Sequence, residues 1–199
     1  MKSKKQLHLN ASMNDLFLEA LQHDVFPGAA AGFFLDDGQR KEKRMWCFGY
    51  TDKSQVQAVQ ISTIYDLASL TKPLVTVLSL LALFEDNHID LDTGLNKLIQ
   101  GKVPSDKEKI TLGDLLAHRS GLPGYRPYFT ELLDIEDFKA RKERIVECIL
   151  AEKLAYQTGE GHIYSDLGFI LLGEIIEKIS GIPLDIFWME KVLRPLALQ

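Results

Sequence analysis

Apolar residues recur along much of the chain at intervals of three and four, the spacing that places them on one face of an α-helix. In the first such stretch Leu9, Met13 and Leu16 keep this spacing, and Pro27-Gly28 ends the segment. The same pattern predicts long helices over residues 7–23, 65–84, 136–154, 167–179 and 184–193. Shorter helices are predicted at residues 95–99 and from Thr111, where Asp114 completes a capping box.

Two stretches have the character of β-strands instead. Residues 29–35 are apolar, residues 44–50 are rich in aromatic side chains, and Asp36-Asp37-Gly38 between them is a turn sequence. The pattern predicts a β-hairpin, which is too small to be stable alone. We therefore expect an incomplete sheet whose exposed edge needs another segment, a partner or self-association to cover it.

Composition narrows the class of protein. With 199 residues, 46% hydrophobic and 26% charged, the chain has the composition of one soluble globular domain over residues 1–199. Its net charge of -5 gives no reason to expect nucleic acid or a membrane surface as a partner. The basic start is followed by no apolar segment, which argues against a secretory signal and favours the cytoplasm. The apolar run 73–84 is too short to span a membrane and is interpreted as a core helix.

The cysteines and histidines suggest no metal chemistry. Cys47 and Cys148 stand far apart, which is typical of reduced packing thiols. No group of His, Cys and Asp residues has the spacing of metal ligands, so we expect no zinc site and no cofactor.

The strongest chemical signal is Ser69-Leu70-Thr71-Lys72, at the start of the apolar helix predicted over residues 65–84. Residues three apart on a helix share a face, so the Lys72 amine can approach the Ser69 hydroxyl. A buried lysine has a lowered pKa and can accept the serine proton, and the free N–H groups of a helix start favour an oxyanion. Pro73 agrees with a position in the first helical turn. The tetrad alone is weak evidence, because such sequences also occur by chance.

Two further segments give the tetrad a context. Residues 110–122 read ITLGDLLAHRSGL, and residues 164–173 read YSDLGFILLG. Together with the tetrad, in this order, they resemble the motifs of the beta-lactamase-related serine hydrolases, which include class C beta-lactamases, D-Ala-D-Ala carboxypeptidases and esterases. The resemblance runs from about residue 27 to residue 196. It implies an α+β fold of the beta-lactamase/transpeptidase type.

The resemblance also implies roles for individual residues. Ser69 would be the acylated nucleophile, Lys72 its proton acceptor and Tyr164 a second acid/base group. The backbone N–H of Ser69 would form one part of the oxyanion hole. A tyrosine has an ordinary pKa of about 10, so Tyr164 would need the nearby charge of the lysine to act as a phenolate. Asp166 would take the place of a substrate-binding asparagine.

The segment at Tyr164 allows two alignments. Read as Tyr164-Ser165-Asp166, it is the Tyr-x-Asn motif with Asp in place of Asn. Read as Ser165-Asp166-Leu167, it is an altered Ser-Asp-Asn motif. The leucines and glycine that follow favour the tyrosine reading. Asp in place of Asn exchanges an amide for a carboxylate that can pair with Lys72 and hold it charged, which weakens the case for the lysine as a base.

Other polar and aromatic residues are open to a structural reading. We interpret His118 as a structural hydrogen-bonding residue and His162 as a surface residue of a loop. Tyr125, with Tyr128 and Phe129, either forms a substrate-binding rim or packs its loop for stability.

One motif of the family is not found in the chain. The resemblance implies a Lys-Thr-Gly or His-x-Gly strand after the tyrosine motif, and nothing after Tyr164 matches it. We therefore expect an N-terminal portion of the fold, namely the hairpin and the helical part. The prediction is a serine hydrolase that transfers acyl groups from a small-molecule ester, amide or beta-lactam. The alternative is an inactive fragment or binding module that retains the fold.

Overall fold

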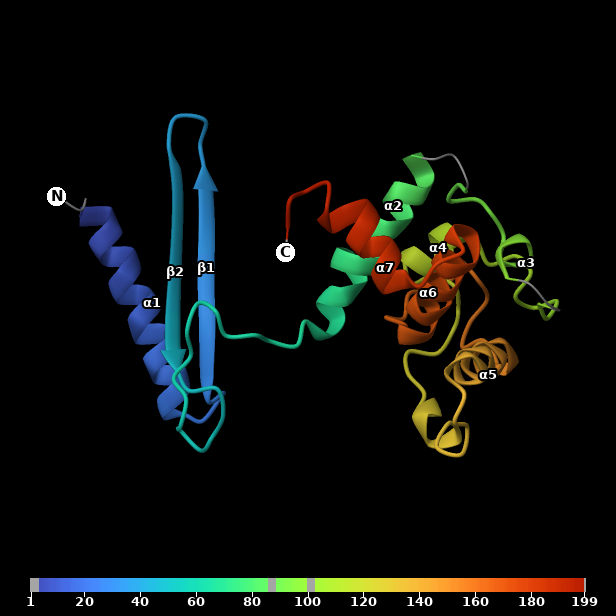
Figure 1. The fold of residues 1–199 in the computed structure, drawn as a ribbon, viewed down its shortest axis with the longest axis horizontal. Coiled ribbons are helices and arrows are strands. Elements are labelled where there is room, and N and C mark those ends of the chain that lie inside the picture. Colours follow the sequence, from blue (N-terminus) through green and yellow to red (C-terminus); the bar gives the residue numbers. More distant parts are fainter. Residues whose placement is uncertain (1–3, 86–88, 100–102, 199) are drawn as a thin grey trace. The chain divides into compact units, whose positions relative to one another are not determined.

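The computed structural model describes residues 4–85, 89–99 and 103–198. It divides into two compact units, Met1–Asp66 and Leu67–Gln199, and each is described here by itself (Figure 1). Seven α-helices and a two-stranded antiparallel sheet within the described residues confirm the predicted α+β class. The prediction that residues 1–199 form one domain stays a prediction.

The first unit is a helix beside a hairpin (Figure 1). Helix α1 (Lys4–Gln22) precedes strands β1 (Gly28–Asp36) and β2 (Lys41–Gly49), which pair in register from Gly28 opposite Gly49 to Asp36 opposite Lys41. The Phe17 ring of α1 stacks on the Phe48 ring of β2, with ring centroids 4.5 Å apart. The predicted hairpin is therefore confirmed.

The hairpin turn is tighter than the sequence suggested, because β2 begins at Lys41 rather than Arg44. The Asp37 carboxylate accepts hydrogen bonds from the backbone N–H groups of Gln39 and Arg40, which closes the turn early. These bonds also lower the pKa of Asp37 below its ordinary value.

The second unit is helical and is built around α6 (Asp166–Ser180). Its other α-helices are α2 (Leu78–Glu85), α3 (Leu95–Leu98), α4 (Leu112–Leu116), α5 (Phe138–Ala151) and α7 (Leu184–Trp188). A 3₁₀ turn lies at Tyr128–Glu131, and a π-helical turn, Met189–Leu193, extends α7. The core holds side chains of at most 2% exposure from most of these helices: Leu80, Leu83, Leu95, Leu112, Leu115, Ile149, Leu171, Leu172, Ile175 and Ile176.

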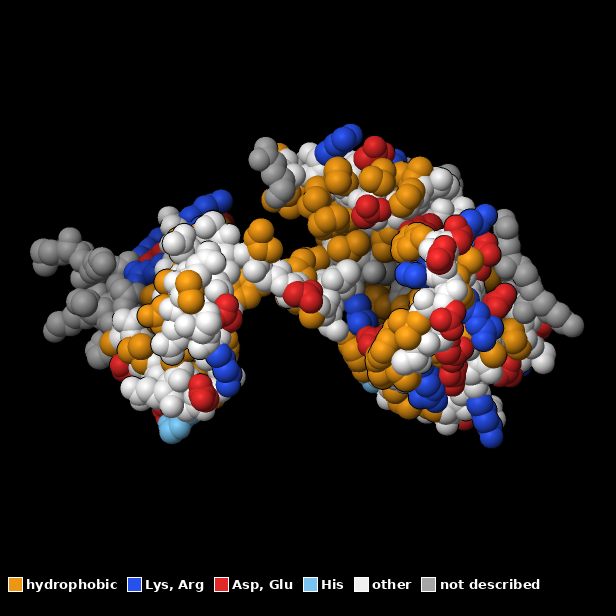
Figure 2. All heavy atoms as spheres, turned by 60° about the horizontal axis from the view of Figure 1, so that its bottom comes forward, with side chains coloured by type: hydrophobic (Ala, Val, Ile, Leu, Met, Phe, Trp, Pro, Cys, Tyr) orange, Lys and Arg blue, Asp and Glu red, His pale blue; other side chains and the backbone are white. Residues whose placement is uncertain are grey.

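Two helix ends have the capping residues that the sequence predicted. Thr111 and Asp114 form the predicted capping box at α4. Gly181 ends α6 with a φ of 74°, a left-handed conformation that glycine adopts without strain. On the face of this unit that Figure 2 shows, hydrophobic side chains occupy broad areas, with charged side chains scattered among them.

The prediction of one regular helix over residues 65–84 is wrong in detail. The helical run begins with a 3₁₀ turn at Ala68–Leu70, continues as a π-helix at Lys72–Val77 and becomes α2 only at Leu78. The run starts at Ala68, so Pro73 lies beyond the first turn, where its missing N–H interrupts the α-helical hydrogen-bond pattern. The indole N–H of Trp188 donates to the Leu74 carbonyl at 2.7 Å, so a side chain satisfies a backbone group of the π-helical turn.

The run Ala68–Glu85 is the only described helix that meets the length and composition of a membrane span, with a mean hydropathy of 1.4. Helices in the cores of soluble proteins meet the same criterion. Leu80 and Leu83 of this run lie in the core of the unit. The expectation that the chain has no membrane partner stays a prediction.

Candidate active site

The candidate nucleophile lies in the short 3₁₀ turn, on the accessible surface of the second unit. Ala68, the residue before Ser69, has a φ of 45°, which a side chain adopts only at some cost. The Ser69 hydroxyl lies 3.4 Å from the Lys72 Nζ atom, so the predicted approach of these two groups is observed.

Lys72 links the serine to a distant part of the chain. Its ammonium group donates to the Asp166 carboxylate at 2.6 Å, as the sequence predicted. The Lys72 side chain is only 15% exposed, and its burial opposes the charge. The bonds to Asp166 and then to Tyr164 outweigh burial, so the pKa of Lys72 is raised above its ordinary value of 10.5. The raised pKa favours the ammonium form of Lys72, whose Nζ atom is placed to donate to the Ser69 hydroxyl.

Tyr164 completes the group. Its ring centroid is 4.9 Å from the Lys72 Nζ atom. Its interaction with the Ser69 hydroxyl, and next that with Lys72, lowers the pKa of the Tyr164 phenol below its ordinary value. The described structure thus brings Ser69, Lys72, Tyr164 and Asp166 together: Lys72 and Tyr164 interact with the Ser69 hydroxyl, and the Asp166 carboxylate pairs with Lys72.

Ser165 decides between the two alignments of this segment. It is 2% exposed or less, caps α6 by accepting from the Gly168 N–H, and donates to the Pro123 carbonyl at 2.7 Å. Its hydroxyl is therefore committed to the fold. Tyr164 is half exposed beside Lys72, so the geometry favours the Tyr164-Ser165-Asp166 reading.

His118 contacts the segment that carries Tyr164 through hydrogen bonds and through its ring. Its Nδ1 atom accepts from the Ser165 N–H at 3.0 Å, and its ring lies 4.6 Å from that of Tyr164 and 5.1 Å from that of Phe169. The His118 carbonyl accepts from the Ile163 N–H and from the Tyr156 hydroxyl, each at 3.1 Å. The residue has a φ of 56°, and its contacts agree with the structural role predicted for it.

The electrostatics of His118 fit an acceptor at Nδ1. Burial, followed by the charges of His162 and Lys72, lowers the pKa of His118 below its ordinary value of 6.5. A neutral ring keeps Nδ1 free to accept the Ser165 N–H. Sequence reasoning placed His118 in its motif but gave no signal for this link to the tyrosine segment.

The remaining predicted residues lie further from the group. Tyr125 is 58% exposed and its carbonyl accepts from the Arg126 side chain; it is not among the described residues that line the cavity at Ser69. His162 is exposed, and its ring lies 6.0 Å from that of His118. The part of the chain that the structure describes holds no cluster of three metal-ligand side chains.

Comparisons with known proteins identify the family of the chain. A sequence model of the family described as Beta-lactamase matches residues 13–199. The chain is 32% identical over 197 residues to an N-acetylmuramyl-L-alanine amidase of Bacillus subtilis (strain 168), covering 91% of this chain and 44% of that protein. It is 36% identical over 144 residues to a putative D-alanyl-D-alanine carboxypeptidase of Salmonella heidelberg (strain SL476), covering 69% and 33%.

A solved structure extends the similarity to the fold. The octameric penicillin-binding protein homologue from Pyrococcus abyssi has a TM-score of 0.74 and 26% identity, covering 94% of this chain and 43% of that one. The chain therefore spans less than half the length of each of these three proteins.

Proposed function

The chain belongs to the beta-lactamase family, and from that premise we propose that it carries the acyl-transfer nucleophile of a serine hydrolase that cleaves an ester or amide bond. The observation that carries the proposal is the meeting of Ser69, Lys72 and Tyr164, from two segments over 90 positions apart. The names of the two relatives, an amidase and a carboxypeptidase, both denote amide hydrolysis, which supports an amide as the substrate.

The first step is attack by Ser69. Because Lys72 is charged and donates to the serine oxygen, Tyr164 is the better proton acceptor of the two. Its lowered pKa increases the fraction present as phenolate near neutral pH. As the Ser69 oxygen bonds to the carbonyl carbon, its proton passes to the Tyr164 oxygen. The Lys72 ammonium stabilises the negative charge that moves between these oxygens.

The second half returns the proton. Tyr164 donates it to the departing amine or alcohol as the bond to the carbonyl carbon breaks, which leaves an acyl group on Ser69. Water then attacks this acyl group and gives a proton to Tyr164, and Tyr164 passes this proton to the Ser69 oxygen as the acyl bond breaks and the acid is released. This assignment differs from the sequence-based one, in which Lys72 accepts the proton, because Asp166 holds the lysine charged.

The experiment is intact mass measurement after incubation with a fluorophosphonate and, separately, with a penicillin. The proposal predicts one adduct, mapped by peptide mass to Ser69 and lost in Ser69→Ala. The Lys72–Asp166 ion pair also suits the alternative, a non-catalytic module, because a charged lysine does not act as a base. Absence of any adduct from both reagents would contradict the proposal and support that alternative.

A further inference from the structure

A large apolar cavity opens directly beside the candidate nucleophile. It has a volume of about 710 Å³, and Ser69, Lys72 and Asp166 are among the residues that line it. Its walls come from α5, α6, the start of α7 and the π-helix Lys72–Val77, all within the second unit. The apolar lining consists of Phe138, Ile145, Val146, Phe169, Ile170 and Leu184.

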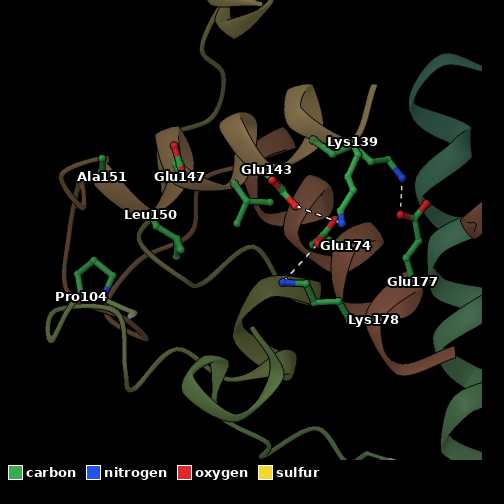
Figure 3. A pocket seen from close by; sticks show the side chains of 11 residues that line it. Pro104, Lys139, Glu143, Glu147, Leu150, Ala151, Glu174, Glu177 and Lys178 are labelled. Carbon is green, nitrogen blue, oxygen red and sulfur yellow. Dashed lines mark hydrogen bonds and ion pairs between the residues drawn. The ribbon is translucent and has the colours of Figure 1, made fainter. Parts of the chain in front are cut away.

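The charges around the cavity are neutralised. Lys142 and Glu177, which line it, form an ion pair with each other. The adjoining hollow, shown in Figure 3, carries further pairs between Lys139 and Glu143 and between Lys178 and Glu174, at 3.9 and 3.4 Å. Each of these cations therefore already has a carboxylate, which disfavours recognition of a charged group deep in the cavity.

Gly173 keeps part of this space open. It lies in the interior of α6, where glycine weakens a helix relative to alanine, and the helix does not require a positive φ there. A Cβ atom at this position would meet only the Leu184 side chain, at the ordinary contact distance of 3.5 Å. The helix therefore has room for a larger residue on the side that lines the cavity.

We propose that this cavity binds the acyl part of the substrate, and that this acyl group is an uncharged aliphatic or arylaliphatic chain. The proposal rests on the proposed function, because an acyl carbon bonded to Ser69 places its chain at the cavity mouth. A volume of about 710 Å³ lies within the range of small-molecule sites, which are mostly apolar with few polar groups. The polar lining consists of Ser69, Lys72 and Asp166 of the candidate active site, two threonines, and the ion-paired side chains of Lys142, Glu174 and Glu177.

The first test compares p-nitrophenyl octanoate with p-nitrophenyl acetate. Each buried methylene favours binding by roughly fourfold, so a cavity that takes three of them gives kcat/KM about 60-fold higher for octanoate. Ile170→Asp places a charge in the lining and should lower this ratio about tenfold. Ile186→Asp is the matched control, because Ile186 is 39% exposed against 40% for Ile170 and lies outside the lining.

A second variant tests the cavity without adding a charge, which by itself could disturb folding in Ile170→Asp. Gly173→Leu fills the cavity with an apolar side chain and should also lower the ratio, whereas Gly173→Ala should keep it. A ratio near one in the unmodified protein would overturn the proposal. So would a ratio that survives in both Ile170→Asp and Gly173→Leu.

A binding measurement separates this proposal from the proposed function. Octanamide and acetamide are titrated calorimetrically into the Ser69→Ala variant, which has no nucleophile. The cavity predicts that octanamide binds at least tenfold more tightly and that Ile170→Asp abolishes the difference. If neither ester is hydrolysed and no fluorophosphonate adduct forms, the proposed function fails while selective octanamide binding still supports the cavity. Equal binding of the two amides would overturn it.

Discussion

The ion pair between Lys72 and Asp166 gives the most quantitative prediction. Replacing Asp166 by Asn keeps an oxygen that accepts from Lys72 but removes the negative charge. Asp166 is 41% exposed, so solvent screens the attraction, and we take the charge's share as about 1 kcal/mol. Asp166 also begins α6, where loss of an acid costs about 0.3–1 kcal/mol. We therefore expect Asp166→Asn to lower the free energy of unfolding by about 1.5 kcal/mol at pH 7.

The assay is urea denaturation followed by fluorescence of Trp188, which bonds to the helical run that carries the site. A Trp46→Phe background removes the tryptophan of the first unit. Asp185→Asn is the matched control, because Asp185 is also an acid in a first helical turn and has no ion pair among the described residues. This control should lose only about 0.3–1 kcal/mol, the share of the helix terminus.

The pH dependence separates the ion pair from the helix terminus. The pKa of Lys72 is raised in the folded state. The ion pair therefore contributes fully to the free energy of unfolding below the unfolded-state pKa near 10.5, and this contribution is lost as pH rises through the folded-state pKa. The extra loss in Asp166→Asn should therefore be constant at neutral pH and shrink in strongly alkaline solution. Equal losses for the two variants at pH 7, or an extra loss that persists at high pH, would refute the reasoning.

Three further predictions concern the segments that hold the site. His118→Asn keeps a side chain that tolerates a positive φ but does not titrate. Because the pKa of His118 is lowered, the wild type should lose stability as pH falls below 6.5, and denaturation of His118→Asn across pH 5–8 should show a flatter profile. Ser165→Ala removes the cap of α6 and the partner of the Pro123 carbonyl, so urea denaturation should show a loss of about 1–3 kcal/mol; a loss under 0.5 kcal/mol would contradict the cap. Gly121→Ala should lower the melting temperature more than Gly181→Ala, because both have a positive φ but only at Gly121 would a Cβ atom lie 2.3 Å from a backbone oxygen, that of Tyr156.

The fold was predictable where local rules decide it. The hairpin follows from apolar strands around an Asp-Gly turn, and the capping box at Thr111 follows from residue types three apart. The end of α6 at Gly181 was likewise visible in the sequence. In each case the stabilising contact lies within a few residues, or, in the hairpin, in the adjacent strand.

The site was predictable only in part, because its contacts join distant positions. The family resemblance, with a carboxylate in place of the motif's amide, indicated that Asp166 could pair with Lys72, and the structure brings the two groups to 2.6 Å. The bond from the Ser165 N–H to the His118 ring has no local signature, since it depends on how two loops pack. A carbonyl group of the π-helix Lys72–Val77 likewise accepts from a distant group, the indole of Trp188. The assignment of Ser165 to the helix cap, rather than to the pocket, needed the same tertiary information.

The central claim is that Ser69 is activated through Tyr164 beside a charged Lys72. The most direct measurement is the second-order rate of Ser69 modification by a fluorophosphonate between pH 6 and 10, in the wild type and in Tyr164→Phe. The claim predicts a wild-type rate that rises with pH and levels off below pH 10, because the pKa of Tyr164 is lowered. In Tyr164→Phe the rate should fall by about 10²–10⁴ and lose this rise. Equal rates in the two proteins, or modification of a residue other than Ser69, would contradict it.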